Sequence, residues 1–308
     1  MNLLRISTFI IALIAVSGCD SSIAKIAADD HEALVVEWRE GRLERLKAED
    51  GYLNLAGLFW LTGEDSTFGS GEQNDLTFPS IAADSIGTFR LSEEGVLMLI
   101  NPGVDVRYEG VPVKSLFLSD DTTDNPVTIT HRSLAWLVIQ RVGRFGVRLR
   151  DFEHPMLESF PPLEYFPIAQ TYRVEGTLQR YPQPRTIQVD TVIEGLGWEP
   201  ESPGVVTFEL DGEPFELEAY TSGDRLFFVF GDSTNGRDTY PAGRFLYAEA
   251  PNEDGVTVLD FNLSYSPPCA FNDFSTCPVA SPRNRLKTDI IAGELYKPGD
   301  LPAFSSND

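Results

Sequence analysis

Short runs of apolar and β-branched residues, each long enough for one strand, recur along most of this chain and restrict the folds open to it. Turn sequences separate several of them, among them Asp211-Gly212, Ser222-Gly223 and Asn235-Gly236. Such spacing is typical of antiparallel sheets, so the sequence predicts a mainly β protein with an antiparallel β sandwich or barrel-like body. The expected strands cover residues 87–91, 96–100, 111–118, 127–130, 134–142, 145–152, 172–181, 186–194, 205–210, 215–220, 226–230 and 256–263, and the glycine-rich, acidic residues 63–75 are expected to form a loop.

One helix is expected before these strands, over residues 29–47. Its apolar side chains recur at helical spacing, with charged residues between them: Leu34, Val35, Trp38, Leu43 and Leu46. The pattern predicts an N-terminal amphipathic helix that packs on the β body. His31 lies near the start of this helix, where we expect a solvated side chain.

The first residues have the features of a secretory signal. One basic side chain, Arg5, precedes an apolar run that is shorter than the roughly 20 residues of a membrane-spanning helix. Val16-Ser17-Gly18-Cys19 then has the form of a lipobox, in which small residues precede a cysteine that becomes acylated. We expect residues 1–18 to be a lipoprotein signal peptide, Cys19 to carry the lipid and residues 19–28 to form a tether. The predicted location is the cell envelope, on a membrane surface that faces the periplasm or the exterior.

The remaining length suits one large domain or two modest ones. The sequence from Pro182 to Arg185 marks either a boundary between two β lobes or a single hairpin loop, and we interpret residues 29–296 as one domain. Residues 297–308 carry two prolines among polar residues and are expected to form an irregular tail.

The balance of charge excludes some partners. The chain has 24 Lys and Arg against 47 Asp and Glu, a net charge of −23. This charge repels the phosphates of nucleic acid and disfavours electrostatic docking on anionic lipid, so the lipid anchor is the expected link to the membrane. A solvated acidic surface and the recruitment of a cationic ligand are both consistent with it.

Cys269 and Cys277 are the only other cysteines. In an oxidising envelope a disulfide between them is expected, whereas a metal site at this place lacks two further ligands nearby. No pair of histidines has ligand spacing, and no phosphate loop or dinucleotide fingerprint follows a strand. The sequence therefore indicates neither a metal ion nor a cofactor.

Two local patterns bear on chemistry. Gly231-Asp232-Ser233 follows an apolar strand, as in the nucleophile block of the GDSL hydrolases, but those enzymes place their catalytic histidine downstream and every histidine here lies upstream. The arginines at 144, 148 and 150 share one face of an expected strand. There they can bind a carboxylate or phosphate, or pair with the acidic side chains of the protein itself.

Longer blocks carry a family resemblance. Residues 230–246, 259–271, 276–278, 284–286 and 292–294 resemble the bacterial domain of unknown function 1684 family, and residues 38–39, 55–61 and the strands ending at Asp151 fit the same pattern. The resemblance implies no activity, but it singles out polar residues at motif positions. These are the candidate ligand-binding residues: Arg148, Asp232, Thr234, Tyr240, Arg244, Asp260, Asn262, Asn284 and Glu294. Many members resemble cytoplasmic proteins, which implies that Cys269 and Cys277 can also be free thiols.

Three functions are consistent with these observations. The leading hypothesis is an envelope lipoprotein that binds a small polar or anionic ligand in a pocket between the β body and residues 260–294. A second is a hydrolase that uses the carboxylate of Asp260 or Asp232 as general base. A third is a structural or partner-binding envelope protein without a catalytic site.

Overall fold

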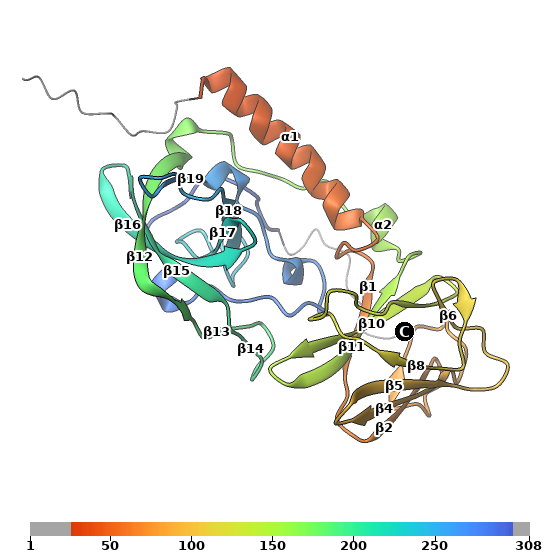
Figure 1. The fold of residues 1–308 in the computed structure, drawn as a ribbon. Helices are drawn as coiled ribbons and strands as arrows, with labels where there is room; N and C mark the ends of the chain where they lie inside the picture. The colour runs from red at the N-terminus through yellow and green to blue at the C-terminus, as the bar shows by residue number, and fades with distance from the viewer. Residues whose placement is uncertain (1–25, 298–308) are drawn as a thin grey trace, which may run out of the picture.

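The computed structural model describes residues 26–297 and consists of two β lobes and a long N-terminal helix (Figure 1). The predicted fold class is confirmed, because the strands pair antiparallel except where β2 meets β3. The predicted signal peptide, Cys19 and most of the predicted tether lie outside the described residues. Within residues 26–297, no helix combines the length and the apolar character that crossing a membrane requires.

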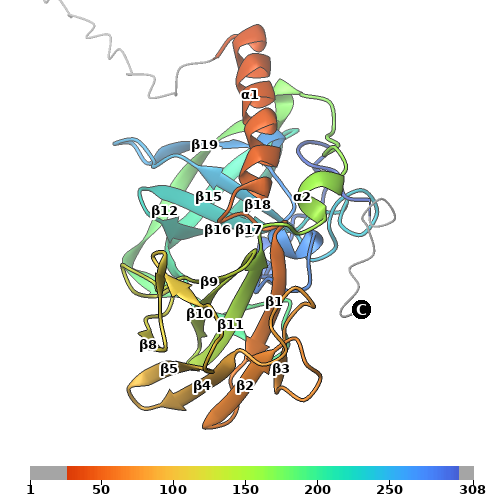
Figure 2. The same cartoon turned by 90° about the vertical axis from the view of Figure 1, so that its right-hand side faces the viewer.

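The expected helix is present as α1 (Ala28–Lys47) and lies along the C-terminal lobe (Figures 1 and 2). Acidic residues in its first turn and basic residues in its last turn suit the helix dipole. Its buried face is formed by His31, Val35, Arg42 and Leu46, at spacings of four and seven residues. The expected solvated position of His31 is therefore wrong, since only 1% of this residue is exposed.

The N-terminal lobe packs two sheets around one core. Its first sheet has the order β1-β11-β10-β9-β6-β7 and its second the order β3-β2-β4-β5-β8. The core includes a cluster of aromatic rings, in which Phe68 stacks on Phe89 with ring centroids 4.1 Å apart and meets Trp136 edge-on. The strands are β1 (Leu55–Trp60), β2 (Asp65–Gly69), β3 (Leu76–Thr77), β4 (Gly87–Ser92), β5 (Gly95–Ile100), β6 (Arg107–Tyr108), β7 (Val111–Pro112), β8 (Ser115–Leu118), β9 (Ile129–His131), β10 (Leu134–Arg141) and β11 (Arg144–Asp151).

The C-terminal lobe is one six-stranded sheet that curves into a half-barrel, in the order β18-β17-β16-β15-β12-β19 (Figure 1). Its strands are β12 (Arg173–Thr186), β15 (Glu201–Leu210), β16 (Glu213–Ser222), β17 (Arg225–Phe230), β18 (Arg244–Ala248) and β19 (Val256–Asp260), with a separate pair of β13 (Val189–Asp190) and β14 (Gly197–Trp198). Alternate residues of β17 and β18 face opposite sides, so that Phe228 and Leu246 enter the main core while Phe227 and Phe245 enter a second cluster.

Irregular chain joins these parts. Residues 152–172 cross between the lobes and include α2 (Met156–Ser159) and the 3-10 turn η1 (Gln170–Tyr172). Residues 182–185 lie inside β12, where a bulge interrupts the pairing with β15, and so form neither a lobe boundary nor a hairpin loop. Between β19 and residue 297, where the description of the structure ends, the helical elements are the 3-10 turns η2 (Phe261–Leu263), η3 (Pro268–Ala270) and η4 (Pro282–Asn284). The backbone of this segment depends on side chains for many of its hydrogen bonds.

Candidate functional site

Arg244 and Asp232 form the most deeply buried ion pair among the described residues. Both side chains are fully buried, and Arg244 Nη2 lies 2.8 Å from Asp232 Oδ2. Arg244 also donates to the carbonyls of Ile290 and Ala292, and the other carboxylate oxygen of Asp232 accepts from Thr234. Burial lowers the pKa of Arg244, although the Asp232 carboxylate opposes this effect. Both side chains are thus bonded to other groups of the protein, and the pair holds the C-terminal segment against β18.

Asp260 and Asn262 bind other parts of the chain. Asp260 Oδ2 lies 2.7 Å from His31 Nε2, which connects the end of β19 to helix α1. The Asn262 amide exchanges two hydrogen bonds of 3.0 Å with the backbone of Ala169, on the segment that crosses between the lobes. Both carboxylate and amide are thus used to fix neighbouring elements in place.

Glu294 holds the same helix at a second point. Its fully buried carboxylate accepts from Arg42 Nε at 3.2 Å and from the backbone of Ser266 at 3.1 Å. The Arg42 guanidinium also lies 4.4 Å from the centre of the Tyr265 ring. Two buried contacts, at His31 and at Arg42, therefore dock α1 on the C-terminal lobe.

Asn284 and Tyr240 also bond to backbone. β16 and β17 pair only near their shared turn, and the Asn284 side chain bridges them beyond it, bonding to Glu218 N and O and to Val229 O at 2.8–3.0 Å. The Tyr240 hydroxyl donates to Cys269 O at 3.2 Å. Of the nine candidate residues, these two and the six described above are thus engaged with the protein itself.

Arg148 differs from its neighbours in having no partner. On β10 and β11, Arg141 forms a two-point pair with Asp121 at 2.6 and 2.9 Å, and Arg150 donates to Asn54 and to the backbone of residues 50–51. Arg144 lies over the ring of Trp60 at 4.6 Å. Within residues 26–297, Arg148 has neither an ion pair nor a hydrogen bond, and its Nε atom is buried without an acceptor.

The strand geometry places Arg148 between the lobes. Val147 and Leu149 enter the core of the N-terminal lobe, so Arg148 points from the opposite face of β11 toward the C-terminal lobe. There it lines a cavity of about 140 Å³, here called the Arg148 cavity. The walls come from both lobes: Tyr52, Arg141, Arg148, Phe245, Pro268, Ser275, Thr276, Cys277 and Pro278.

Electrostatics in the Arg148 cavity favour an anion. Burial lowers the pKa of the Arg148 guanidinium, and the nearby cation of Arg141 lowers it further. The carboxylate of Asp121 opposes both effects, but it is already paired with Arg141. An arginine side chain stays charged in proteins, so the cavity contains a positive charge without an ion-pair partner of its own. No Asp or Glu is among the described residues that line it, even though acidic residues outnumber basic ones about two to one in the chain.

A larger groove lies next to this cavity, and the two share Tyr52, Phe245 and Pro268 in their walls. This aromatic groove, of about 510 Å³, lies between α1 and the outer face of β17 and β18. It is lined by Trp38, Arg42, Arg45, Tyr52, Arg225, Phe227, Phe245, Tyr247, Tyr265 and Pro268. Again, the described lining contains arginines and aromatic rings but no carboxylate.

The two cysteines lie next to the Arg148 cavity as free thiols. Cys269 N donates to Cys277 Sγ at 3.1 Å. Hydrogen bonding from Cys277 lowers the pKa of the Cys269 thiol, while burial raises the pKa of Cys277. The disulfide expected from the sequence stays a prediction, and the two side chains are close enough for a local contact in either state.

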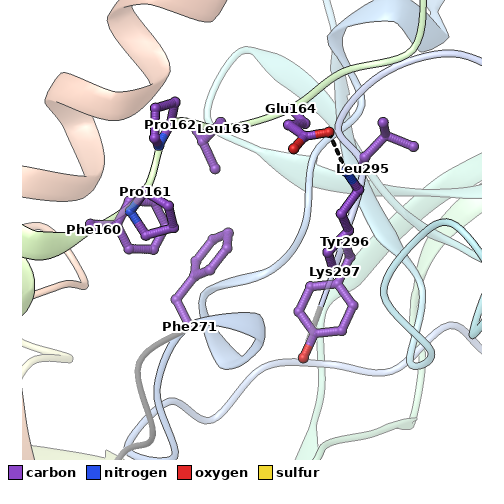
Figure 3. A pocket seen from close by; sticks show the side chains of 9 residues that line it. All are labelled: Phe160, Pro161, Pro162, Leu163, Glu164, Phe271, Leu295, Tyr296 and Lys297. Carbon is purple, nitrogen blue, oxygen red and sulfur yellow. Dashed lines mark hydrogen bonds and ion pairs between the residues drawn. The ribbon is translucent and has the colours of Figure 1, made fainter. Parts of the chain in front are cut away.

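A third hollow is apolar. Phe160 and Phe271 meet edge-on at 5.3 Å in a pocket of about 220 Å³ that also includes Leu163, Leu295 and Tyr296 (Figure 3). Its charged groups, Glu164 and Lys297, are 2.5 Å apart and neutralise each other (Figure 3). This pocket offers shape but no unpaired polar group to orient a ligand. Elsewhere, no cluster of three or more potential metal ligands occurs in residues 26–297.

Sequence reasoning named Arg148 but missed most residues of the aromatic groove. Arg45, Arg225 and Tyr247 come from α1, β17 and β18. Tyr52 comes from the loop between α1 and β1, and no spacing along the chain relates these residues. No local signal identifies them, since arginine and aromatic residues occur along the whole sequence.

The fold and this site describe a mainly β protein of two lobes with an arginine-lined cavity where they meet. Residues 158–295 match the model of a family described as proteins of unknown function (DUF1684), and the chain belongs to this family. The match covers the C-terminal sheet and leaves Arg148, Arg45 and the N-terminal lobe outside it.

A solved relative is also uncharacterized. The solution NMR structure of a protein from Haloarcula marismortui is 34% identical over 44% of this chain and 77% of that one, with a TM-score of 0.38. No curated protein matches the chain.

Proposed function

We propose that this protein binds a small anionic ligand at the Arg148 cavity. The observation that carries the proposal is a partly buried guanidinium whose buried Nε atom has no protein partner, in a cavity whose described lining has no carboxylate. Burying an unpaired charge is costly, and proteins normally pair it or neutralise it. An oxyanion accepts hydrogen bonds from arginine in a fork geometry, and the Thr276 hydroxyl in the same wall supplies a further donor.

Binding of inorganic phosphate and of acetate to the full chain tests this proposal by isothermal titration calorimetry at low ionic strength. The wild type is expected to bind at least one of them at a single site. Arg148→Met should weaken binding at least about tenfold, because a hydrogen bond to a charged group contributes about 1.5–3 kcal/mol. Arg144→Met is the matched control, since this arginine lies on the same strand but stacks on Trp60 outside the cavity. Unchanged affinity in Arg148→Met, or binding of neither anion to the wild type, would refute the proposal.

The hydrolase alternative has less support. A general base needs access to substrate and a lone pair free to accept a proton. Asp232 is fully buried against Arg244, and Asp260 is engaged by His31 and by Asn262. A purely structural role explains the contacts of both carboxylates, and these contacts do not require a substrate-binding site.

We further propose that the protein acts from the envelope as a lipoprotein, on the evidence of the lipobox at residues 16–19. Labelling of expressing cells with a fatty acid tests this. Label is expected on the wild type and on Cys269→Ser but not on Cys19→Ser, and label on Cys19→Ser would contradict the assignment.

A further inference from the structure

The aromatic groove beside the Arg148 cavity points to the rest of the ligand. The two hollows share Tyr52, Phe245 and Pro268 in their walls, so the groove lies directly beside an anionic group held at Arg148. The cavity of about 140 Å³ is small, whereas the groove of about 510 Å³ is in the range of small-molecule sites. We propose that the ligand is an aromatic oxyanion, with a planar ring in the groove and a phosphate or carboxylate at Arg148. This inference rests on the proposed function and names its ligand class.

The groove is floored by aromatic rings on adjacent strands. Phe227 on β17 and Tyr247 on β18 are register partners, with ring centroids 4.8 Å apart. Phe245 meets Phe227 at 5.0 Å and Tyr265 at 5.8 Å, both edge-on. These side chains face away from the main core because alternate residues of β17 and β18 fill it. Aromatic surfaces of this kind bind planar rings by stacking and by edge-on contact.

Cations at the rim suit the same ligand. The Arg225 guanidinium lies 4.4 Å from the centre of the Tyr247 ring, and Arg45 lies 5.4 Å from the centre of the Trp38 ring. Neither arginine forms an ion pair in the described part of the chain. Burial and the neighbouring Arg42 cation lower the pKa of Arg45, while the Glu44 carboxylate opposes this effect. A planar, electron-rich and negatively charged molecule satisfies these groups together.

Calorimetric titration of the full chain with matched ligand pairs tests the inference. Phenyl phosphate is compared with inorganic phosphate and cyclohexyl phosphate, and benzoate with acetate. We expect at least one aromatic anion to bind about tenfold more tightly than its ring-free counterpart, and phenyl phosphate more tightly than cyclohexyl phosphate if phosphate is the preferred group. The preferred pair identifies the anionic group.

Two variants locate the ring. Phe227→Leu is expected to bind the aromatic anion little more tightly than the ring-free anion, while its affinity for the ring-free anion is retained. Tyr247→Leu, at a less buried position, makes the same test if Phe227→Leu does not fold. Equal affinity of aromatic and ring-free anions for the wild type would overturn this inference but not the proposed function. The same holds if the variants fold and still bind the aromatic anion as much more tightly than the ring-free anion as the wild type does. Binding of no anion at all would instead overturn the proposed function.

Discussion

Replacing Arg244 tests how this protein uses its buried charges. The guanidinium donates to the Asp232 carboxylate, to Ser264 Oγ and to two backbone carbonyls, and its side chain is fully buried. Arg244→Met keeps much of the apolar volume but leaves Asp232 Oδ2 without a protein donor. Breaking a buried pair by removing one partner costs about 3–5 kcal/mol. For a protein of this length, that loss lowers the melting temperature by about 10 °C.

Urea denaturation measures this loss, with Arg90→Met as the control. Arg90 forms the same kind of pair with Asp65, at 2.7 Å, but both side chains are about half exposed. Exposed pairs contribute about 0–1 kcal/mol, so the control should differ little from the wild type. Similar small losses in both variants would show that the Arg244 network does not hold the C-terminal segment in place. A double variant, Arg244→Met with Asp232→Leu, should recover part of the loss.

Arg148→Met is expected to change the free energy of unfolding in the opposite direction. This arginine also lies in a buried setting, but it has no partner whose charge would be left unpaired. Its removal should leave the free energy of unfolding unchanged or increase it by about 1 kcal/mol in the absence of anions. A loss as large as that of Arg244→Met would mean that Arg148 is structural, and would also count against the anion site.

Three further outcomes are expected. Although burial raises the pKa of Asp121, hydrogen bonds from its arginine partner and a backbone amide outweigh this and lower it. The stabilisation by the Asp121 carboxylate is present above about pH 4 and is lost as the pH falls through the lowered pKa. Between these pH values, the urea midpoint of Asp121→Asn should therefore fall less than that of the wild type. Iodoacetamide should alkylate Cys269 before Cys277, because the Cys269 thiol has the lower pKa and is more exposed; peptide mass mapping that finds the reverse order contradicts this. Arg42→Ala should accelerate hydrogen exchange of the α1 backbone amides, because it removes the ion pair with Glu294. The control Glu40→Ala, on the exposed face of α1, should not, and equal exchange rates in the two variants would argue against docking through Glu294.

The strand pattern was readable where apolar runs are bounded by a turn. The expected runs at 134–142 and 145–152 coincide with β10 and β11, because both runs are largely apolar and a tight turn with positive φ at Val142 and Gly143 joins them. The predicted loop over residues 63–75 was wrong in part, since β2 occupies Asp65–Gly69. Its polar residues are typical of a loop, and pairing with β4 and β3 makes them a strand.

Long-range pairing explains what the sequence did not reveal. His31 and Asp260 are 229 residues apart, and Arg42 and Glu294 are 252 apart. A histidine near a helix start is usually solvated, and nothing local indicates that a carboxylate from β19 will cover it. The same limit applies to the aromatic groove, whose residues converge only after α1 docks and the two lobes meet.

The motif residues have a common physical reason that does not require a ligand. Residues 261–297 contain no strand longer than an isolated bridge, so only a few of their backbone groups pair with the sheet, as Tyr265 does with Phe245. Four motif side chains form hydrogen bonds that fix this segment, each with a backbone atom of the segment or of a neighbouring part of the chain: Arg244, Asn262, Asn284 and Tyr240. A segment of this kind folds uniquely only if those side chains are kept. A dense block of polar motif residues therefore marks buried irregular backbone, and a ligand site is better sought where a buried polar group is left without a partner, as at Arg148.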